Sequence, residues 1–328
     1  MTVNITHKGQ LKEESMKSPV FKRIVKYAGN IITILSIAFV VKVMLSLDIN
    51  ISVITNHVTF ILFIICCSIM VFTVFLLAYG WRTVLSSLAG TKIPFRDVCF
   101  IYAKANMGKY LPGNVMHYIE RNLFAGSLGL DQKAILLSTL LEITGLITVC
   151  TLFGILTMGS QMVSVLKLIL KRKYLIVCAS FIMLAFILIL VFRKKIKKSF
   201  AGLPWKLLAA AFLRTLPLYF FSILSGGCAL AIIFGAFTRF GMTLGNILMI
   251  LSAYTISWVI GFIIPGSPGG IGVREFVLLF LLKGKYYEEY ILTCILIHRF
   301  ASVVGDILAY WAALTWNKRG CPARCPRK

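Results

Sequence analysis

The sequence predicts an all-α, polytopic integral membrane protein. Hydrophobic residues make up 59% of its 328 residues and charged residues 14%, and the mean hydropathy is +0.89. Soluble domains carry about 25% charged residues. In addition, apolar stretches near the ~20 residues that span a bilayer recur along the chain. These observations together exclude an ordinary soluble fold.

The apolar stretches predict the transmembrane helices. Six of them lie at about 27–47, 58–80, 134–159, 174–192, 244–264 and 290–316. The stretch 206–238 is longer and contains Arg214, Pro217 and Gly226-Gly227, so it fits one long tilted helix or a hairpin of two short ones. Two further apolar segments, about 97–125 and 265–283, are interrupted by glycine and proline. We expect a basic segment over 1–26, one transmembrane domain over 27–316 and a basic tail over 317–328.

The charge pattern predicts the orientation. Lys and Arg total 35 against 11 Asp and Glu, and most of them lie in short loops beside apolar stretches, as cytoplasmic loops require. No basic stripe with interleaved aromatic residues indicates nucleic-acid binding. The basic N-terminus, the run 193–198 and the basic tail all favour the cytoplasm, so the number of crossings is even. Eight crossings follow if 206–238 counts as two and both interrupted segments are re-entrant; the basic cluster at 167–173 is then the exception.

The sequence gives no sign of a metal site, a cofactor or a catalytic nucleophile. Most of the nine cysteines lie in apolar runs, where Cys behaves as a small hydrophobic residue. The histidines have no metal-ligand spacing: His7, His57, His117 and His298. We therefore do not expect an enzyme.

The two interrupted segments predict a polar site at membrane depth. The first reads Gly-Lys-Tyr-Leu-Pro-Gly-Asn-Val over 108–115, followed by Glu120-Arg121, and the second runs from Pro265-Gly266 to Arg274-Glu275. An interrupted backbone is tolerated in hydrocarbon only where protein or a water-filled cavity satisfies its polar groups. With eight crossings, the segments enter from opposite sides of the membrane, which is the arrangement of an inverted repeat.

A short helix that begins after each interruption would attract anions. Helix N-termini carry free N–H groups and the positive end of the dipole, and Asn114 and Ser267 are candidate capping residues. Lys109, Arg121 and Arg274 lie nearby in the sequence. This pattern predicts a phosphate pocket, and two simple interfacial turns are the alternative.

Ionisable residues inside the apolar stretches have two interpretations. Glu142 and Asp306 each lie within a predicted span, and Arg299 precedes Asp306 by seven residues on the same helix face. Such residues line a pathway or pair with one another. A structural ion pair would join Arg299 or Arg214 to Asp306 or Glu142, and both interpretations remain open.

The motifs at 108–115 and 268–275, together with Arg299 and Gly305-Asp306, resemble a known family. The chain is similar to the transmembrane (flippase-like) domain of lysylphosphatidylglycerol synthases over nearly its whole length. The resemblance implies a bundle with re-entrant helices that moves lipids between leaflets of the bacterial cytoplasmic membrane. In bifunctional members an aminoacyltransferase domain follows, whereas this chain ends about twelve residues after the last span. Phospholipids, aminoacyl-lipids and lipid-linked sugars are therefore all candidate substrates.

The resemblance, with the ionisable residues above, gives the predicted substrate site: Lys109, Pro112, Gly113, Asn114, His117, Arg121, Glu142, Gly269, Gly270, Gly272, Arg274, Glu275, Arg299 and Asp306. Pro268 completes the second motif. Lys109, Arg121 and Arg274 would hold the phosphate of an anionic or zwitterionic headgroup. Glu142, Glu275 and Asp306 would balance charge or receive a cationic headgroup.

The predicted function is a lipid transporter or flippase. The alternative is a non-catalytic membrane partner of a separate synthase or glycosyltransferase. A lipid-modifying enzyme would need a nucleophile or a metal site, and a cation exchanger would need more paired acids. A homo-oligomer remains open.

Overall fold

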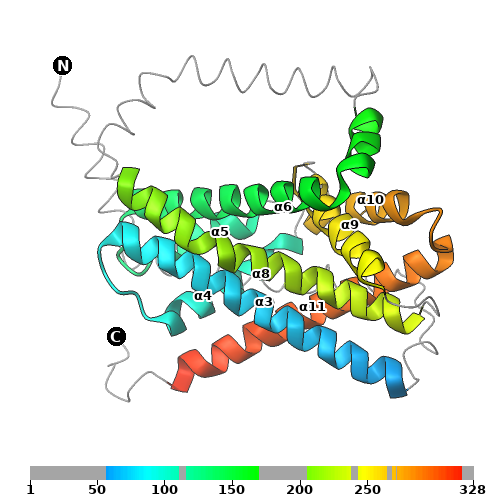
Figure 1. Ribbon diagram of the computed structural model, residues 1–328. Helices are drawn as coiled ribbons and strands as arrows, with labels where there is room; N and C mark the ends of the chain where they lie inside the picture. Colours follow the sequence, from blue (N-terminus) through cyan, green and yellow to red (C-terminus); the bar gives the residue numbers. More distant parts are fainter. Residues whose placement is uncertain are drawn as a thin grey trace.

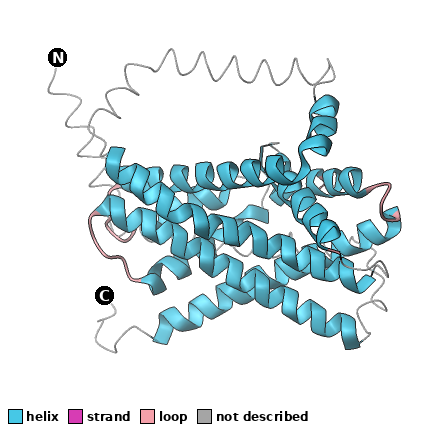
Figure 2. Cartoon of the chain, viewed as in Figure 1, coloured by secondary structure: helices cyan, strands magenta, loops and turns pink. Residues whose placement is uncertain are grey.

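The computed structural model describes residues 57–110, 116–169, 205–237, 243–263, 268–270 and 272–319. Every regular element there is helical: α3 (His57–Ala89), α4 (Phe95–Asn106), η2 (Met107–Tyr110), α5 (Met116–Gly126), α6 (Gln132–Ile169), α8 (Trp205–Phe237), α9 (Leu244–Ile263), η3 (Pro268–Gly270), α10 (Val273–Leu282) and α11 (Glu288–Arg319). Figure 2 shows the described part of the chain as helices, with short turns between α3 and α4 and between α10 and α11. The predicted all-α class is confirmed. The predicted spans at 27–47 and 174–192 and the basic run 193–198 lie outside the described residues.

The described part of the chain is that of an integral membrane protein. Five of its helices are long and apolar enough to cross a membrane: Phe60–Ala89, Gln132–Gly154, Trp205–Phe237, Leu244–Ile263 and Glu288–Lys318. Large apolar side chains point outward from them, among them Phe72 of α3 and Phe221 of α8, which are more than half exposed. In water such a surface would be costly, whereas in lipid it meets hydrocarbon.

Helix α8 is continuous over 33 residues, so the hairpin alternative for 206–238 is wrong. Pro217 lies inside it without ending it. The two glycines that suggested a turn instead let neighbouring helices approach closely. A Cβ on Gly227 would lie 2.7 Å from the Leu251 side chain of α9, and the Gly226 carbonyl contacts His298 Nε2 of α11 at 3.0 Å. The count of eight crossings treated 206–238 as two of them, so one continuous helix removes the basis for that count.

Side-chain contacts define two ends of the bundle, and the same ends can be followed in Figure 1. At the first end, the C-terminal parts of α3 and α11 meet the start of α4, where the Phe95 and Trp316 rings lie 5.9 Å apart. Trp81 of α3 donates a hydrogen bond to Ser138 of α6 there, at 2.9 Å. At the second end, Phe234 of α8 packs against Tyr286 in the turn between α10 and α11, with ring centroids 5.3 Å apart.

Two helical hairpins enter the bundle from these opposite ends. In the first hairpin, α4 and α5 lie side by side with η2 at the tip, and Lys104 of α4 lies over the Phe124 ring of α5 at 4.5 Å. In the second hairpin, α9 starts at the second end, η3 forms the tip and α10 returns to the same end. The tips meet: a Cβ on Gly269 would lie 3.5 Å from the Lys109 carbonyl oxygen.

The remaining long helices form a frame around the hairpins. Tyr219 of α8 is fully buried between α3 and α6, where it faces two glycines. A Cβ on Gly80 or Gly145 would come within 2.9 Å or 2.7 Å of its ring. Because each glycine leaves room for the ring, α3, α6 and α8 pack closely.

Candidate functional site

A polar cavity of about 160 Å³ lies where the two hairpin tips meet. Its walls come from both hairpins and from α3, α6 and α11. The residues that line it are Met70, Thr73, Val74, Leu77, Tyr102, Asn106, Lys109, Tyr110, His117, Tyr118, Glu142, Leu146, Tyr254, Trp258, Phe262, Gly269, Arg274, Arg299, Ser302, Val303 and Asp306.

Lys109 and Asp306 form the first ion pair of the cavity. Lys109 Nζ lies 2.5 Å from Asp306 Oδ2, and the Asp306 side chain is 3% exposed. Asn106 Nδ2 donates to Oδ1 at 2.7 Å, and the Tyr110 hydroxyl donates to Oδ2. Both carboxylate oxygens are thus engaged by donors of the first hairpin, and the pair joins this hairpin to α11.

Arg121 and Glu142 form the second ion pair, with Nη1 and Oε2 2.8 Å apart and both side chains almost fully buried. The Tyr102 hydroxyl donates to Glu142 Oε1 at 2.8 Å. The guanidinium lies over the rings of Trp81, Tyr102 and Tyr118 at 4.7, 4.8 and 5.2 Å, an aromatic environment that favours a cation. This pair joins the first hairpin to α6.

Arg299 and Glu275 form the third ion pair, with Nε and Oε1 2.5 Å apart. The two terminal nitrogens of Arg299 donate to the Gly269 and Gly270 carbonyls at 3.2 and 3.3 Å. Glu275 Oε2 in turn accepts the Gly272 backbone N–H at 2.6 Å. All three glycines have positive φ angles, 58°, 76° and 87°, a conformation that favours glycine. One arginine and one glutamate therefore satisfy the interrupted backbone between η3 and α10.

These pairings differ from the expected ones. Arg299 pairs with Glu275 rather than with Asp306, although Arg299 and Asp306 share a helix face. Arg214 is exposed on α8 and takes part in no ion pair among the described residues. The reason is reach: Lys109 and Arg121 approach the acids from the first hairpin at shorter distances than Arg299 or Arg214.

Arg274 lines the cavity without an acidic partner. Among the described residues, no carboxylate lies within ion-pair distance of its guanidinium. Its Nε is buried and has no hydrogen-bond partner there, and the guanidinium lies 5.6 Å from the Trp258 ring. Its stem fits a slot between two glycines: a Cβ on Gly270 would lie 2.6 Å from Nε, and one on Gly261 would collide with Cγ.

The structure brings most of the predicted site residues together. Lys109, His117, Glu142, Gly269, Arg274, Arg299 and Asp306 line the cavity. Arg121 and Glu275 lie directly behind them, and Gly270 and Gly272 shape the interrupted backbone. Pro112, Gly113, Asn114 and Ser267 lie outside the described residues.

Sequence reasoning missed the polar and aromatic partners of the site. Tyr102 and Asn106 lie four residues apart, on one face of α4. Tyr110 continues this row into η2, and all three donate to the buried acids. On α9, Tyr254 and Trp258 have the same spacing and line the cavity. These residues could have been predicted from the sequence, because each row places hydrogen-bonding side chains at helical spacing within an apolar segment.

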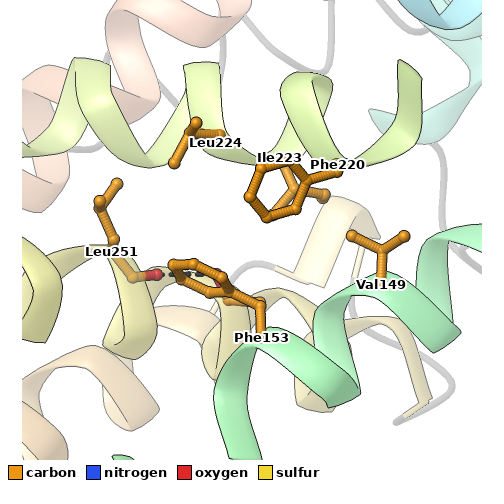
Figure 3. A pocket seen from close by; sticks show the side chains of 7 residues that line it. Val149, Phe153, Phe220, Ile223, Leu224 and Leu251 are labelled. Carbon is orange, nitrogen blue, oxygen red and sulfur yellow. Dashed lines mark hydrogen bonds between the residues drawn. The ribbon is translucent and has the colours of Figure 1, made fainter. Parts of the chain in front are cut away.

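A small apolar crevice continues from the cavity toward the second end. It lies between α6, α8 and α9 and is lined by Val149, Phe153, Phe220, Ile223, Leu224, Leu251 and Thr255. Figure 3 shows the Phe153 and Phe220 rings projecting from α6 and α8 into the space between the helices. Val149 lies one turn after Leu146 on α6, and Leu251 one turn before Tyr254 on α9, so the polar and apolar spaces are neighbours.

The described residues contain no group of three His, Cys, Asp or Glu side chains that could hold a metal ion. No protein family model, no curated protein and no solved structure matches the chain. The resemblance to the lysylphosphatidylglycerol synthase domain therefore stays a prediction.

Proposed function

We propose that the chain is a lipid transporter that holds a phosphate-containing headgroup in the cavity between the two hairpin tips. The observation that carries the proposal is Arg274, a cation that faces a polar cavity inside an apolar bundle without a carboxylate partner among the described residues. Intramembrane charges are costly, and they mark substrate pathways where no protein partner neutralises them.

The charges around the cavity favour a ligand with one negative charge. Lys109, Arg121 and Arg299 each face one of the three acids, so Arg274 supplies the remaining positive charge. A guanidinium binds a phosphodiester through two parallel hydrogen bonds. We therefore assign phosphate binding to Arg274, and a supporting role to Lys109 and Arg121, which were first expected to hold the phosphate.

The acids of the cavity are a poor site for a cationic headgroup. Protein donors engage both oxygens of Asp306, and Tyr102 and Arg121 engage Glu142. A volume of about 160 Å³ has room for several ordered water molecules, and a phosphate with a small alcohol fits it.

We propose that both hairpins are re-entrant. Helices α4, α5 and α10 contain 12, 11 and 10 residues. At 1.5 Å per residue these three reach about 15–18 Å, roughly half of a ~30 Å hydrocarbon core, whereas the 20 residues of α9 reach about 30 Å, so α9 would have to lie strongly tilted in the second hairpin. The tips would then lie near the midplane, and the hairpins would enter from opposite faces, as in an inverted repeat. Arg299 donates hydrogen bonds to the Gly269 and Gly270 carbonyls. These bonds support a tip within the hydrocarbon core, because lipid supplies no hydrogen bonds to an interrupted backbone.

This arrangement revises the proposed number of crossings. Helices α3, α6, α8 and α11 join one end of the bundle to the other, and α9 with α10 forms a hairpin. With the apolar stretches 27–47 and 174–192 as two further spans, six crossings result instead of eight. Six is also even, so both termini remain on the cytoplasmic side.

A leaflet-exposure assay tests the function. Proteoliposomes would contain a fluorescent anionic phospholipid, and a membrane-impermeant quencher would report its movement between leaflets. Arg274→Gln removes the cavity cation, and Arg214→Gln makes the same change at an exposed position on α8. We expect Arg274→Gln to slow movement about tenfold or more, because a charge-assisted hydrogen bond contributes about 1.5–3 kcal/mol. Arg214→Gln should match the wild type.

Two outcomes would contradict the proposal. Equal rates for the wild type and Arg274→Gln would remove the assigned role of Arg274. A wild-type chain that moves no lipid, yet co-purifies with a synthase or glycosyltransferase, would favour the non-catalytic partner. Mass spectrometry of the lipids that co-purify with the wild type, but not with Arg274→Gln, would identify the substrate.

A further inference from the structure

Lys109 offers the cavity more hydrogen-bonding capacity than its ion pair with Asp306 uses. An ammonium group carries three N–H donors, and among the described residues one carboxylate oxygen, Asp306 Oδ2, lies within ion-pair distance of it. The Lys109 side chain is 26% exposed and that of Asp306 is 3% exposed, so Lys109 is the more accessible member of the pair. Asn106 and Tyr110 also donate to Asp306. Lys109 can therefore contact a ligand in the cavity without leaving Asp306 without a donor.

Arg274 faces the same cavity from the second hairpin, close to the point where the two tips meet. A Cβ on Gly269 would lie 3.5 Å from the Lys109 carbonyl oxygen of the first hairpin. A Cβ on the next residue, Gly270, would lie 2.6 Å from Arg274 Nε. Lys109 and Arg274 thus flank one contact between the tips, and both line the cavity there.

The described residues form no ion pair between the two hairpins. The acids that face Lys109 and Arg121 of the first hairpin belong to α11 and α6. The cation that faces Glu275 of the second hairpin belongs to α11. An anion between Lys109 and Arg274 would therefore supply an ionic link between the hairpins that these pairs do not provide.

A phosphodiester has the charge and the shape for this link. Its two non-bridging oxygens share one negative charge and point in different directions, so one oxygen can accept hydrogen bonds from Arg274 while the other accepts one from Lys109. Both bonds would be charge-assisted, and such bonds are stronger in a low-dielectric interior than in water. The cavity of about 160 Å³ has room for the phosphate group.

We propose that the phosphate of the ligand is a removable clamp that binds Lys109 and Arg274 together and holds the two hairpin tips closed. When the headgroup enters, it adds an ionic link across the tips. When it leaves, that link is lost and the tips are free to separate. Ligand binding and hairpin movement are therefore coupled through one group. That the phosphate belongs to a lipid rests on the proposed function, whereas the link itself rests on the positions of the two cations.

The distance between the hairpins tests the clamp. Ile119 on α5 and Ile263 on α9 are exposed, and each adjoins a ring of the Tyr118–Phe262 contact between the hairpins. Cysteines at these two positions, in a full chain without the native cysteines, would carry spin labels for a pulsed electron paramagnetic resonance measurement in detergent. Diheptanoyl phosphatidylmethanol, an anionic phosphodiester lipid with a small alcohol, should shorten and narrow the distance distribution. Diheptanoylglycerol, which lacks the phosphate, should leave it unchanged.

Variants of Lys109 separate the clamp from binding at Arg274 alone. In the labelled chain, Lys109→Met should abolish the closure and weaken binding of the same lipid about tenfold, because one charge-assisted hydrogen bond is lost. Lys109→Arg keeps a cation and should retain the closure. Lys133→Met, the same change at an exposed position on α6, should match the unsubstituted chain. The double variant Lys109→Met/Asp306→Asn removes both charges of the pair, so it leaves no unpaired carboxylate that could prevent folding, and it should show the same loss of closure.

The outcomes distinguish the clamp from the proposed function. Lipid binding without closure, or equal closure in the labelled chain with and without Lys109→Met, would overturn the clamp and leave lipid transport standing. Dimethyl phosphate, a phosphodiester without acyl chains, is the second probe. If it closes the tips and the phospholipid does not, the clamp holds for a soluble phosphodiester and the proposed lipid transport fails. If neither anion binds, both proposals fail.

Discussion

Arg299 of α11 and Glu275 of α10 are joined at the interrupted tip of the second hairpin, with Arg299 Nε 2.5 Å from Glu275 Oε1. The same guanidinium donates to the carbonyls of Gly269 and Gly270. The Arg299 side chain therefore pairs with Glu275 and also holds the backbone of η3 in place. The position of Arg274 depends on that backbone.

Substitutions of Arg299 should separate the contribution of its charge to stability from the contribution of its several hydrogen-bond donors. In Arg299→Met, Glu275 and two carbonyls lose their donors, and the free energy of unfolding should fall by about 3–5 kcal/mol. Arg299→Lys keeps the charge but carries its three donors on one nitrogen, which cannot reach all three of the acceptors that the separate guanidinium nitrogens contact, so the loss should be roughly half as large. Reversible unfolding in mixed micelles measures both values.

The exposed pair Lys283–Glu288 is the matched control for this experiment. Its nitrogen and oxygen lie 2.7 Å apart, but the side chains are 64% and 52% exposed. Lys283→Met should change the free energy of unfolding by less than about 1 kcal/mol. A loss as large as that of Arg299→Met would show that the location of a pair in the bundle does not determine its contribution.

The pair Arg121–Glu142 should show strong coupling in a double-mutant cycle. Arg121→Met leaves the carboxylate of Glu142 buried without its cation, and Glu142→Leu leaves the guanidinium without its acid, so each should cost about 3–5 kcal/mol. The double variant should cost much less than the sum, because a methionine among the Trp81 and Tyr102 rings packs well. Additive losses would mean that the two residues act independently.

Gly261 should be required for lipid binding because it leaves room for the Arg274 side chain. Gly261→Ala places a Cβ against Arg274 Cγ and should displace the guanidinium from its slot. Gly245→Ala, on the same helix with nothing within 4 Å of the new Cβ, is the control. Titration with a short-chain anionic phospholipid, followed by tryptophan fluorescence, should show at least tenfold weaker binding for Gly261→Ala alone. Equal lipid affinities of Gly261→Ala and Gly245→Ala would contradict the proposal that Gly261 makes room for Arg274.

Cysteine labelling should distinguish re-entrant hairpins from crossings. Lys92 and Asp131 flank the first hairpin, and Thr243 and Lys285 flank the second; all four are exposed. In a background without the native cysteines, a membrane-impermeant maleimide should reach the first two positions from one side and the other two from the opposite side. If Lys92→Cys and Asp131→Cys were labelled from different sides, α4 and α5 together would cross the membrane.

Hydropathy predicted the long helices well. The predicted spans 244–264 and 290–316 correspond to α9 (Leu244–Ile263) and α11 (Glu288–Arg319). The hairpin alternative for α8 failed for a tertiary reason: Gly226 and Gly227 face residues of α9 and α11, which the local sequence cannot show. Glycine permits the close approach of neighbouring helices as well as a turn.

The types of site residue could be predicted, but their pairing could not. Helical spacing relates residues within one helix, and it placed Arg299 and Asp306 on one face. The partner of Asp306 is Lys109, 197 residues away in the sequence, and it reaches the acid only because the first hairpin places η2 beside α11. Arg274 became important for the same reason, since its lack of an acidic partner is visible only after the other charges that line the cavity have been paired.

The three ion pairs of the site also determine which surfaces can separate. Within the described residues, each pair links a hairpin to a long helix of the frame, and none links one hairpin to the other. Among the described residues, the hairpins touch at Gly269 against the Lys109 backbone and at the Tyr118 ring against Phe262. The described parts of the two tips can therefore move apart without separating an ion pair, so packing makes the main contribution there to the energy barrier for opening the cavity.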